Sequence, residues 1–173
     1  VSLLIEGNEQ EATKFGEVID SYNQDRKSID RNVTQEAHDY VEANPELKAR
    51  KSTVIYNPKW MKGIVGIVAS RLIETYYRPT VVLTKSNGFV TGSARSVVGF
   101  DLYQAVESCS DLLENFGGHM YAAGLTMKEE NVEAFTKRFN DYVEQNIDPS
   151  ILVPQLDIDS ELLFSDITDE FHR

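Results

Sequence analysis

Apolar side chains recur every three or four residues from Glu9 to Ala43, a stretch that contains no proline. This spacing places them along one face and predicts a long amphipathic helix, with Asn44-Pro45 as its stop. A helix of this length in so short a chain is expected to bridge to a structure outside the sequence. Its apolar positions are Ala12, Phe15, Val18, Ile19, Tyr22, Ile29, Val33, Ala37, Tyr40 and Val41.

The middle of the chain combines short β-branched runs with one stretch of helical periodicity, which Pro79 ends. Thr80-Val-Val-Leu-Thr84 is short and apolar, as expected of a strand covered on both faces. Asn87-Gly88 is a turn signal for a hairpin. The elements predicted here are, in order, a strand at 52–56, a helix at 64–77, and strands at 80–84 and 89–95.

A helix, a strand and a second helix are predicted in the remainder of the domain. Asp101 is a suitable N-cap with Gln104 three residues on, so a helix should run from there to about Glu114. The pattern predicts a strand at 122–127 and a last amphipathic helix at 129–146. The expected fold class is therefore α/β, a mixed β-sheet flanked by helices and preceded by a long connector helix.

These patterns divide the chain into three regions. Residues 1–49 hold the connector helix and residues 50–148 the α/β domain. After Asp148-Pro149 the pattern changes to Val153-Pro-Gln-Leu-Asp-Ile-Asp159, which predicts a linker and the first strand of a following domain over residues 149–173. The chain is thus expected to be a piece cut from a longer protein.

Charge is unevenly distributed along the 173 residues. The net charge is −11, yet residues 53–96 carry six basic and one acidic side chains, a local excess of +5. A basic island can attract phosphate locally, while the acidic remainder disfavours indiscriminate binding of nucleic acid. Chance clustering of surface lysines is the alternative interpretation.

Composition also bears on where the protein works. No apolar run approaches the roughly 18 residues that a membrane span needs, so no membrane partner is expected. Cys109 is the only cysteine, so no disulfide can form within the chain. A lone thiol fits a reducing cytoplasm, which is the expected location.

Gly63 and Gly66 lie at the entrance of the helix predicted at 64–77. Backbone N–H groups and the positive end of the helix dipole can hold an anion at such a place. Glycines there can equally serve close packing of the helix on the sheet. The sequence leaves both readings open.

Ser93 and Arg95 belong to the strand predicted at 89–95 and should project from the same face, because side chains alternate along a strand. A hydroxyl and a guanidinium that converge on one point suit a terminal phosphate. The alternative is a surface arginine paired with a carboxylate on a helix.

Gly117 and Gly118 precede His119 in the run Phe116-Gly-Gly-His-Met-Tyr-Ala-Ala-Gly124. We expect the paired glycines to turn the chain sharply and to leave the imidazole uncrowded at the apex. His119 can then donate to a phosphoryl oxygen or approach a metal-bound one. A purely structural histidine is the alternative.

Complete catalytic machinery is missing from the sequence. Its histidines, His38, His119 and His172, lie far apart, and no aspartate-rich cluster accompanies His119. A hydrolytic metal site needs such a cluster. The chain is expected to bind no metal and to be inactive by itself.

Three segments, in this order and at these separations, resemble the DHH-associated domain of bacterial RecJ exonucleases: WMKGIVGIVASRL, TGSARSVVGFDLY and LLENFGGHMYAAGLTM. The resemblance spans about residues 50–146. It implies a 5′-to-3′ exonuclease that acts on single-stranded DNA, uses Mn²⁺ or Mg²⁺, and works in recombination and repair. The long helix then connects to a catalytic DHH domain upstream, and residues 153–164 begin an oligonucleotide-binding-fold domain.

The resemblance also implies roles for individual residues. Ser93 and Arg95 match positions that hold the phosphate at the 5′ end, and His119 matches a catalytic position that faces the metal centre. Met61 departs from the family, which commonly has His after the Trp, so a polar role there is in doubt. The residues expected to contact nucleic acid or phosphate are Ser93, Arg95, Ser96, Gly117, Gly118, Gly63 and Arg71.

Two other functions remain open at this point. One is a DHH-family phosphoesterase that degrades short oligonucleotides or cyclic dinucleotides. The other is an RNA-binding module like the C-terminal domain of alanyl-tRNA synthetase. The long helix and the apparent further domain favour the RecJ-like function.

Overall fold

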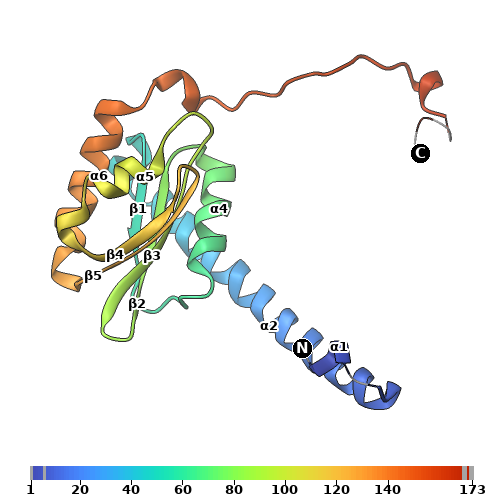
Figure 1. Cartoon of the computed structure of the whole chain (residues 1–173). Coiled ribbons are helices and arrows are strands. Elements are labelled where there is room, and N and C mark those ends of the chain that lie inside the picture. The colour runs from blue at the N-terminus through green and yellow to red at the C-terminus, as the bar shows by residue number, and fades with distance from the viewer. Residues whose placement is uncertain (1, 6, 169–170, 172–173) are drawn as a thin grey trace.

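The computed structural model describes residues 2–5, 7–168 and 171, and its centre is a five-stranded sheet (Figure 1). The strand order is β1-β2-β3-β5-β4, with β1 parallel to β2 and all other neighbours antiparallel. The predicted mixed sheet is therefore confirmed. The strands are β1 Thr53–Tyr56, β2 Thr80–Ser86, β3 Phe89–Arg95, β4 Leu113–His119 and β5 Ala122–Met127.

Helices cover both faces of this sheet, and one long helix runs away from it (Figure 1). The α-helices are α1 Ser2–Ile5, α2 Glu9–Glu42, α3 Pro45–Ala49, α4 Val65–Tyr76, α5 Leu102–Glu107 and α6 Val132–Asn146. The short 3₁₀ turns are η1 Ser110–Leu112, η2 Glu129–Asn131, η3 Pro149–Leu152 and η4 Phe164–Asp166.

Two hydrophobic cores lie on opposite sides of the sheet, because successive strand residues point to opposite faces. On one side, α5 and α6 cover side chains such as Leu83 and Leu125, and Phe135 of α6 is fully buried there. On the other side, α4 and the end of α2 cover Ile55 and Val82. This second cover lies over β1, β2 and β3, and it leaves the β4 and β5 side of that face open.

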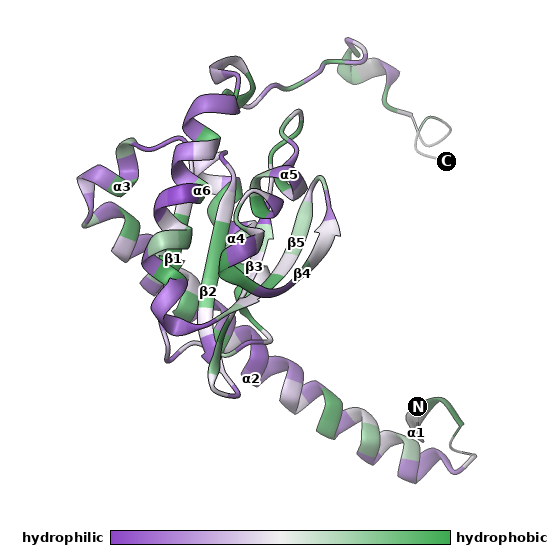
Figure 2. Ribbon diagram, turned by 60° about the vertical axis from the view of Figure 1, so that its left-hand side comes forward, coloured by the Kyte–Doolittle hydropathy of each residue, from purple (hydrophilic) through white to green (hydrophobic). Residues whose placement is uncertain are grey.

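Only the last part of α2 belongs to the domain. Its buried residues are Val33, Ala37 and Val41, which pack against α4. The preceding turns project into solvent and carry an exposed apolar stripe, visible as green bands among purple in Figure 2. Members of this stripe are Phe15, Val18, Ile19 and Tyr22.

Arg78 fixes the junction between α3 and the sheet. Its guanidinium is buried, donates from Nε to Thr53 Oγ1 over 2.7 Å and from Nη1 to the Lys48 carbonyl over 2.7 Å, and lies 5.2 Å from the centre of the Tyr76 ring. The Thr53 hydroxyl and backbone carbonyls thus accept from a cation that no carboxylate of the described residues pairs with, and its buried Nη2 has no hydrogen-bond partner among them.

Two expectations about the second half of the chain are wrong. The helix that starts at Asp101 ends at Glu107, and the segment that follows η1 forms strand β4, which the sequence pattern does not predict. Residues 153–163 contain no strand in the structure. Their assignment to a following domain stays a prediction.

Cys109 lies just after α5 in the core on the α6 side. Its side chain is fully buried, and burial raises the pKa of its thiol. It is a free cysteine, as its being the single cysteine of the sequence requires. None of the helices in the described ranges has the length and apolar content needed to cross a membrane.

Candidate functional site

The open half of the sheet presents three rows of side chains on the face that α4 partly covers. Strand pairing defines the rows, because residues in register on neighbouring strands point to the same face. Three of the positions on β4 and β5 carry a small side chain or none, at Ala122, Gly124 and Gly117. The rows are Arg95–Ala122–His119, Ser93–Gly124–Gly117 and Thr91–Thr126–Asn115.

Ser93 and Arg95 converge as the sequence predicts. Both side chains are half-buried, and Arg95 Nη1 donates to Ser93 Oγ and to the Ala94 carbonyl, each over 2.9 Å. No ion pair among the described residues includes Arg95. The helix carboxylate that would make Arg95 a structural residue is therefore absent from the described part of the chain.

Gly66 explains how α4 can pass so close to this pair. A Cβ atom at Gly66 would lie 3.1 Å from Arg95 Nη2 and 3.2 Å from Ser93 Oγ. The packing reading of this glycine is therefore supported. Gly63 has nothing within 4 Å of its Cβ position and lines an open hollow of about 490 Å³ beside Arg95.

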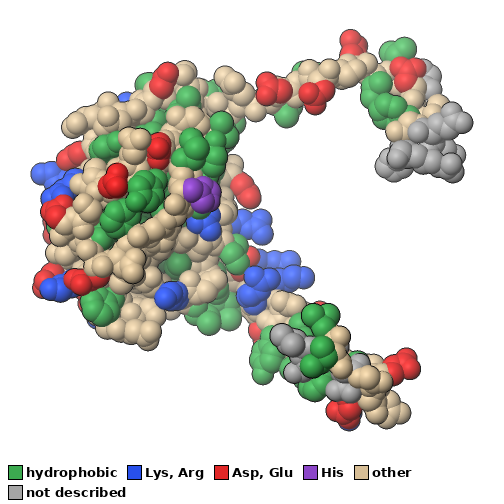
Figure 3. Space-filling model, in the orientation of Figure 1, with side chains coloured by type: hydrophobic (Ala, Val, Ile, Leu, Met, Phe, Trp, Pro, Cys, Tyr) green, Lys and Arg blue, Asp and Glu red, His purple; other side chains and the backbone are tan. Residues whose placement is uncertain are grey.

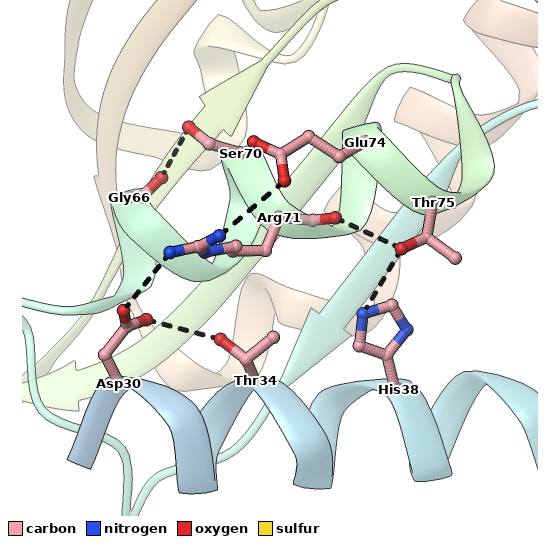
Figure 4. A network of polar contacts seen from close by, with 8 residues as sticks. All are labelled: Asp30, Thr34, His38, Gly66, Ser70, Arg71, Glu74 and Thr75. Atoms are coloured by element: carbon pink, nitrogen blue, oxygen red, sulfur yellow. Dashed lines mark hydrogen bonds and ion pairs between the residues drawn. The ribbon is translucent and has the colours of Figure 1, made fainter. Parts of the chain in front are cut away.

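Arg71 borders the same hollow from the second turn of α4 (Figure 4). Its guanidinium lies 3.9 Å from Asp30 of α2 and 3.8 Å from Glu74. Both distances exceed those of hydrogen bonds, so the carboxylates hold Arg71 only loosely. Arg71 is half-exposed, so its side chain can turn toward an anion. Its expected contact with phosphate stays a prediction.

His119 is the last residue of β4 and is exposed. Its Nδ1 accepts a hydrogen bond from the Tyr121 backbone N–H over 3.3 Å, and its ring meets the Tyr121 ring edge-on. The neutral imidazole then carries its proton on Nε2, so it presents a donor to the outside. Arg95 and His119 occupy the two ends of one row, two strands apart or roughly 10 Å, with Ala122 between them.

The paired glycines do not form the turn that the sequence suggests. Gly117 and Gly118 lie within β4, and the chain reverses at Met120 and Tyr121 instead. Gly118 has φ +151°, and a Cβ atom there would lie 2.2 Å from the Ala122 carbonyl oxygen. Gly118 is therefore required by the hairpin itself.

Ser96 and Met61 lie at the margin of the site. The Ser96 hydroxyl donates to the Phe100 carbonyl over 3.0 Å, which holds the loop after β3. Its expected phosphate contact stays a prediction. Met61 is 55% exposed in the loop before α4, where a His would also be accessible.

The structure divides the basic island into structural and available charges. Arg78 is buried, and Lys85 pairs with Glu129 over 2.6 Å. Lys59 and Lys62, like Arg95, take part in no ion pair among the described residues. Figure 3 shows Lys and Arg side chains gathered near the base of the long helix.

Lys62 also borders the open sheet face, although no sequence pattern marks it as a candidate. Together with Asn115 and Thr126 it borders a second hollow of about 420 Å³ on the open sheet face. Alternation along 113–119 could have found Asn115, had that segment been recognised as a strand.

The residues present do not fit a catalytic metal pair. Within the described ranges, no group of three or more His, Cys, Asp and Glu side chains is placed to hold a metal ion. His119 alone supplies one nitrogen, whereas catalytic two-metal centres need several carboxylates and histidines. Any such centre near this site would need ligands from beyond the described residues.

The DHHA1 domain family matches residues 50–145, and the chain belongs to this family. Beyond the domain itself, it is similar to the single-stranded-DNA-specific exonuclease RecJ of *Bacillus subtilis*, with 35% identity over 98% of this chain and 22% of that protein. The RecJ of *Escherichia coli* is 33% identical over 98% of this chain and 31% of its own length. The chain thus spans between a fifth and a third of these relatives.

Solved structures give the same assignment. The crystal structure of exonuclease RecJ bound to manganese matches with a TM-score of 0.75 and 30% identity, over 86% of this chain and 36% of that one. RecJ of *Thermus thermophilus* in complex with Mg²⁺ matches with a TM-score of 0.74 and 29% identity, over 85% of this chain and 22% of that one. The sheet domain and its helices therefore have the RecJ arrangement.

Proposed function

We propose that this chain is the substrate-holding part of a RecJ-like 5′-to-3′ exonuclease on single-stranded DNA. The single observation that carries the proposal is the Ser93–Arg95 pair on an open, glycine-lined sheet face that also ends in His119. The exonuclease activity in this proposal is taken from the names of the relatives. The relatives are several times longer than this chain, so they can contain a catalytic DHH domain that the chain lacks.

Arg95 acts in this proposal as the clamp for the 5′ phosphate. A guanidinium offers five N–H donors, and Nη1 is directed to Ser93 and to the Ala94 carbonyl, both neutral acceptors. A phosphate oxygen outcompetes a neutral acceptor, because hydrogen bonds between two charged groups are stronger. His119 at the other end of the row then donates to the phosphate that lies over Ala122.

The finer parts of the proposal rest on the family resemblance. They are the 5′ end as the point of attack, a role in recombination and repair, and a cytoplasmic location. Mn²⁺ or Mg²⁺ would be held by the DHH domain of the longer protein, as the metals in the related crystal structures suggest. The chain by itself is then a binding module without hydrolytic activity.

The test compares Arg95→Ala and Arg95→Lys with the wild type in the longer enzyme, on strands with and without a 5′ phosphate. Losing a hydrogen bond to a charged group costs about 1.5–3 kcal/mol, roughly ten- to hundredfold in binding. We expect Arg95→Ala to lose that much on phosphorylated strands only. Arg95→Lys should recover part of it, because an ammonium keeps the charge but not the planar fork.

Melting temperatures recorded alongside separate binding from folding. Truncation of a half-buried side chain at the end of β3 opens no core cavity, so the variants should melt close to the wild type. Equal losses on both kinds of strand, or early melting, would show that Arg95 is a structural residue.

A further inference from the structure

Neither the backbone conformation nor the packing of the domain requires glycine at two positions in the middle row of the open face. Gly117 and Gly124 face each other across β4 and β5, and neither has a positive φ. A Cβ atom at Gly117 would meet nothing within 4 Å, and one at Gly124 would meet only the Gly92 carbonyl at 4.0 Å. Gly118 and Gly92 differ, since a Cβ atom there would lie within 2.3 Å of another atom.

The space above these two glycines is the 420 Å³ hollow described above. Its lining includes the polar residues Lys62, Asn115, Thr91 and Thr126 and the apolar Leu125, whose carbonyl accepts from the Thr91 hydroxyl. Proteins hold single-stranded nucleic acid by cationic contacts along its backbone together with aromatic side chains that stack on its bases, and this lining has a lysine but no aromatic residue among those described. This lining favours the backbone.

We propose that the Gly117–Gly124 row, the glycine platform, seats the sugar–phosphate backbone of the strand beyond its first nucleotide. Lys62 takes a phosphate of that segment. The inference rests on the proposed function, because Ser93 and Arg95 place the 5′ end. Glycine is then found at 117 and 124 because any side chain would lift the strand off the sheet.

The platform also gives the bound strand a direction. Arg95 and Thr91 are four residues apart on β3, about 13 Å at roughly 3.3 Å per residue. One nucleotide of a single strand is shorter than this distance, so the phosphates at the two ends belong to different nucleotides. The strand therefore enters with its 5′ end at Arg95 and His119 and continues across the platform toward Asn115.

The first test uses Gly117→Ala and Gly124→Ala in the 173-residue chain, with binding of 3′-labelled, 5′-phosphorylated oligo(dT) measured by fluorescence anisotropy at low ionic strength. Alanine removes backbone freedom from the unfolded state and meets no clash, so both variants should melt at or above the wild-type temperature. We expect about tenfold weaker binding. Thymidine 5′-monophosphate, which does not reach the platform, should compete for the Arg95 site as it does in the wild type.

The second test is a matched pair, Lys62→Ala and Lys59→Ala. Both lysines are exposed, lie in the loop before α4 and lack an ion pair among the described residues, but only Lys62 borders the platform. We expect Lys62→Ala to weaken binding several-fold more than Lys59→Ala. One uncharged methylphosphonate linkage, moved along the oligonucleotide, should abolish the difference at a single position near the 5′ end.

These outcomes separate the platform from the proposed function. Glycine variants that bind oligo(dT) as the wild type does, or two lysine variants with equal losses, would overturn the platform. A wild-type chain without preference for a 5′ phosphate, whose glycine variants still lose affinity, would keep the platform and contradict the placement of the 5′ end.

Discussion

Some polar side chains of this domain form hydrogen bonds that stabilise the fold, and others remain available to a ligand at the surface. The hydrogen-bond partners of each side chain distinguish the two kinds. Arg78 is buried with its Nε and Nη1 donors directed to Thr53 and backbone carbonyls, whereas Arg95 borders an open hollow. Two tyrosines belong to the first kind. Tyr56 donates to Glu129 over 2.7 Å and Tyr76 to Glu42 over 2.9 Å.

These tyrosines should make the fold sensitive to alkali. Burial, then the bond to Glu129, raises the pKa of Tyr56 to about 12, and burial, then the bond to Glu42, raises the pKa of Tyr76 to about 12. An unfolded tyrosine ionises near 10. Between these values the unfolded chain loses protons that the folded chain keeps, so stability present below pH 10 falls as the pH rises toward 12.

Urea unfolding at several pH values checks this prediction. The Tyr56→Phe and Tyr76→Phe double variant lacks both hydroxyls and should lose less stability over that interval than the wild type. Parallel losses in the two proteins would mean that other groups govern alkaline unfolding.

At the scale of elements, the sequence predicts those that carry a strong period. Helix α2, the strands β1, β2, β3 and β5, and helix α6 are confirmed to within a few residues, because apolar spacing and turn signals agree there. Strand β4 is missed, because Leu-Glu-Asn-Phe-Gly-Gly-His has two glycines and no β-branched residue. Its strand form comes from pairing with β5, a tertiary effect.

The candidate site follows the same division. Ser93 and Arg95 could be placed on one face from alternation in β3 alone. The row that joins Arg95 to His119 could not be predicted from the sequence, because it depends on β5 lying between β3 and β4. Lys62 reaches the face from a loop whose path no periodicity describes.

The long helix offers a matched pair of valines for a stability prediction. Val41 is fully buried against α4, and Val18 is 51% exposed on the projecting part. Val41→Ala should cost about 2 kcal/mol of unfolding free energy through lost burial and a residual cavity. Val18→Ala should change it by less than about 0.5 kcal/mol.

Denaturant unfolding of both variants gives the comparison directly. A large loss at Val18 would show that the projecting turns of α2 pack within the folded chain. A negligible loss at Val41 would show that the end of α2 does not stabilise the sheet domain.

For the whole molecule, charge sets how the chain meets DNA. The +5 region of residues 53–96 lies within a chain of net charge −11, and some of its cations are already engaged by the fold. We expect the 173-residue chain to bind single-stranded DNA weakly, because its negative net charge repels the strand, and to lose that binding as salt rises, because the contacts that hold the strand are ionic. Anisotropy titrations from low to physiological ionic strength measure this. Tight binding that ignores salt would contradict it.

Chemical modification of the buried Cys109 thiol can report how often the hydrophobic core opens. A thiol reagent in solution can reach the sulfur only when the core around it opens, because the side chain has no exposed surface in the folded domain. The rate of modification under native conditions therefore counts openings of this core, without any introduced probe. Because the chain has a single cysteine, each modified molecule records an opening at one known place.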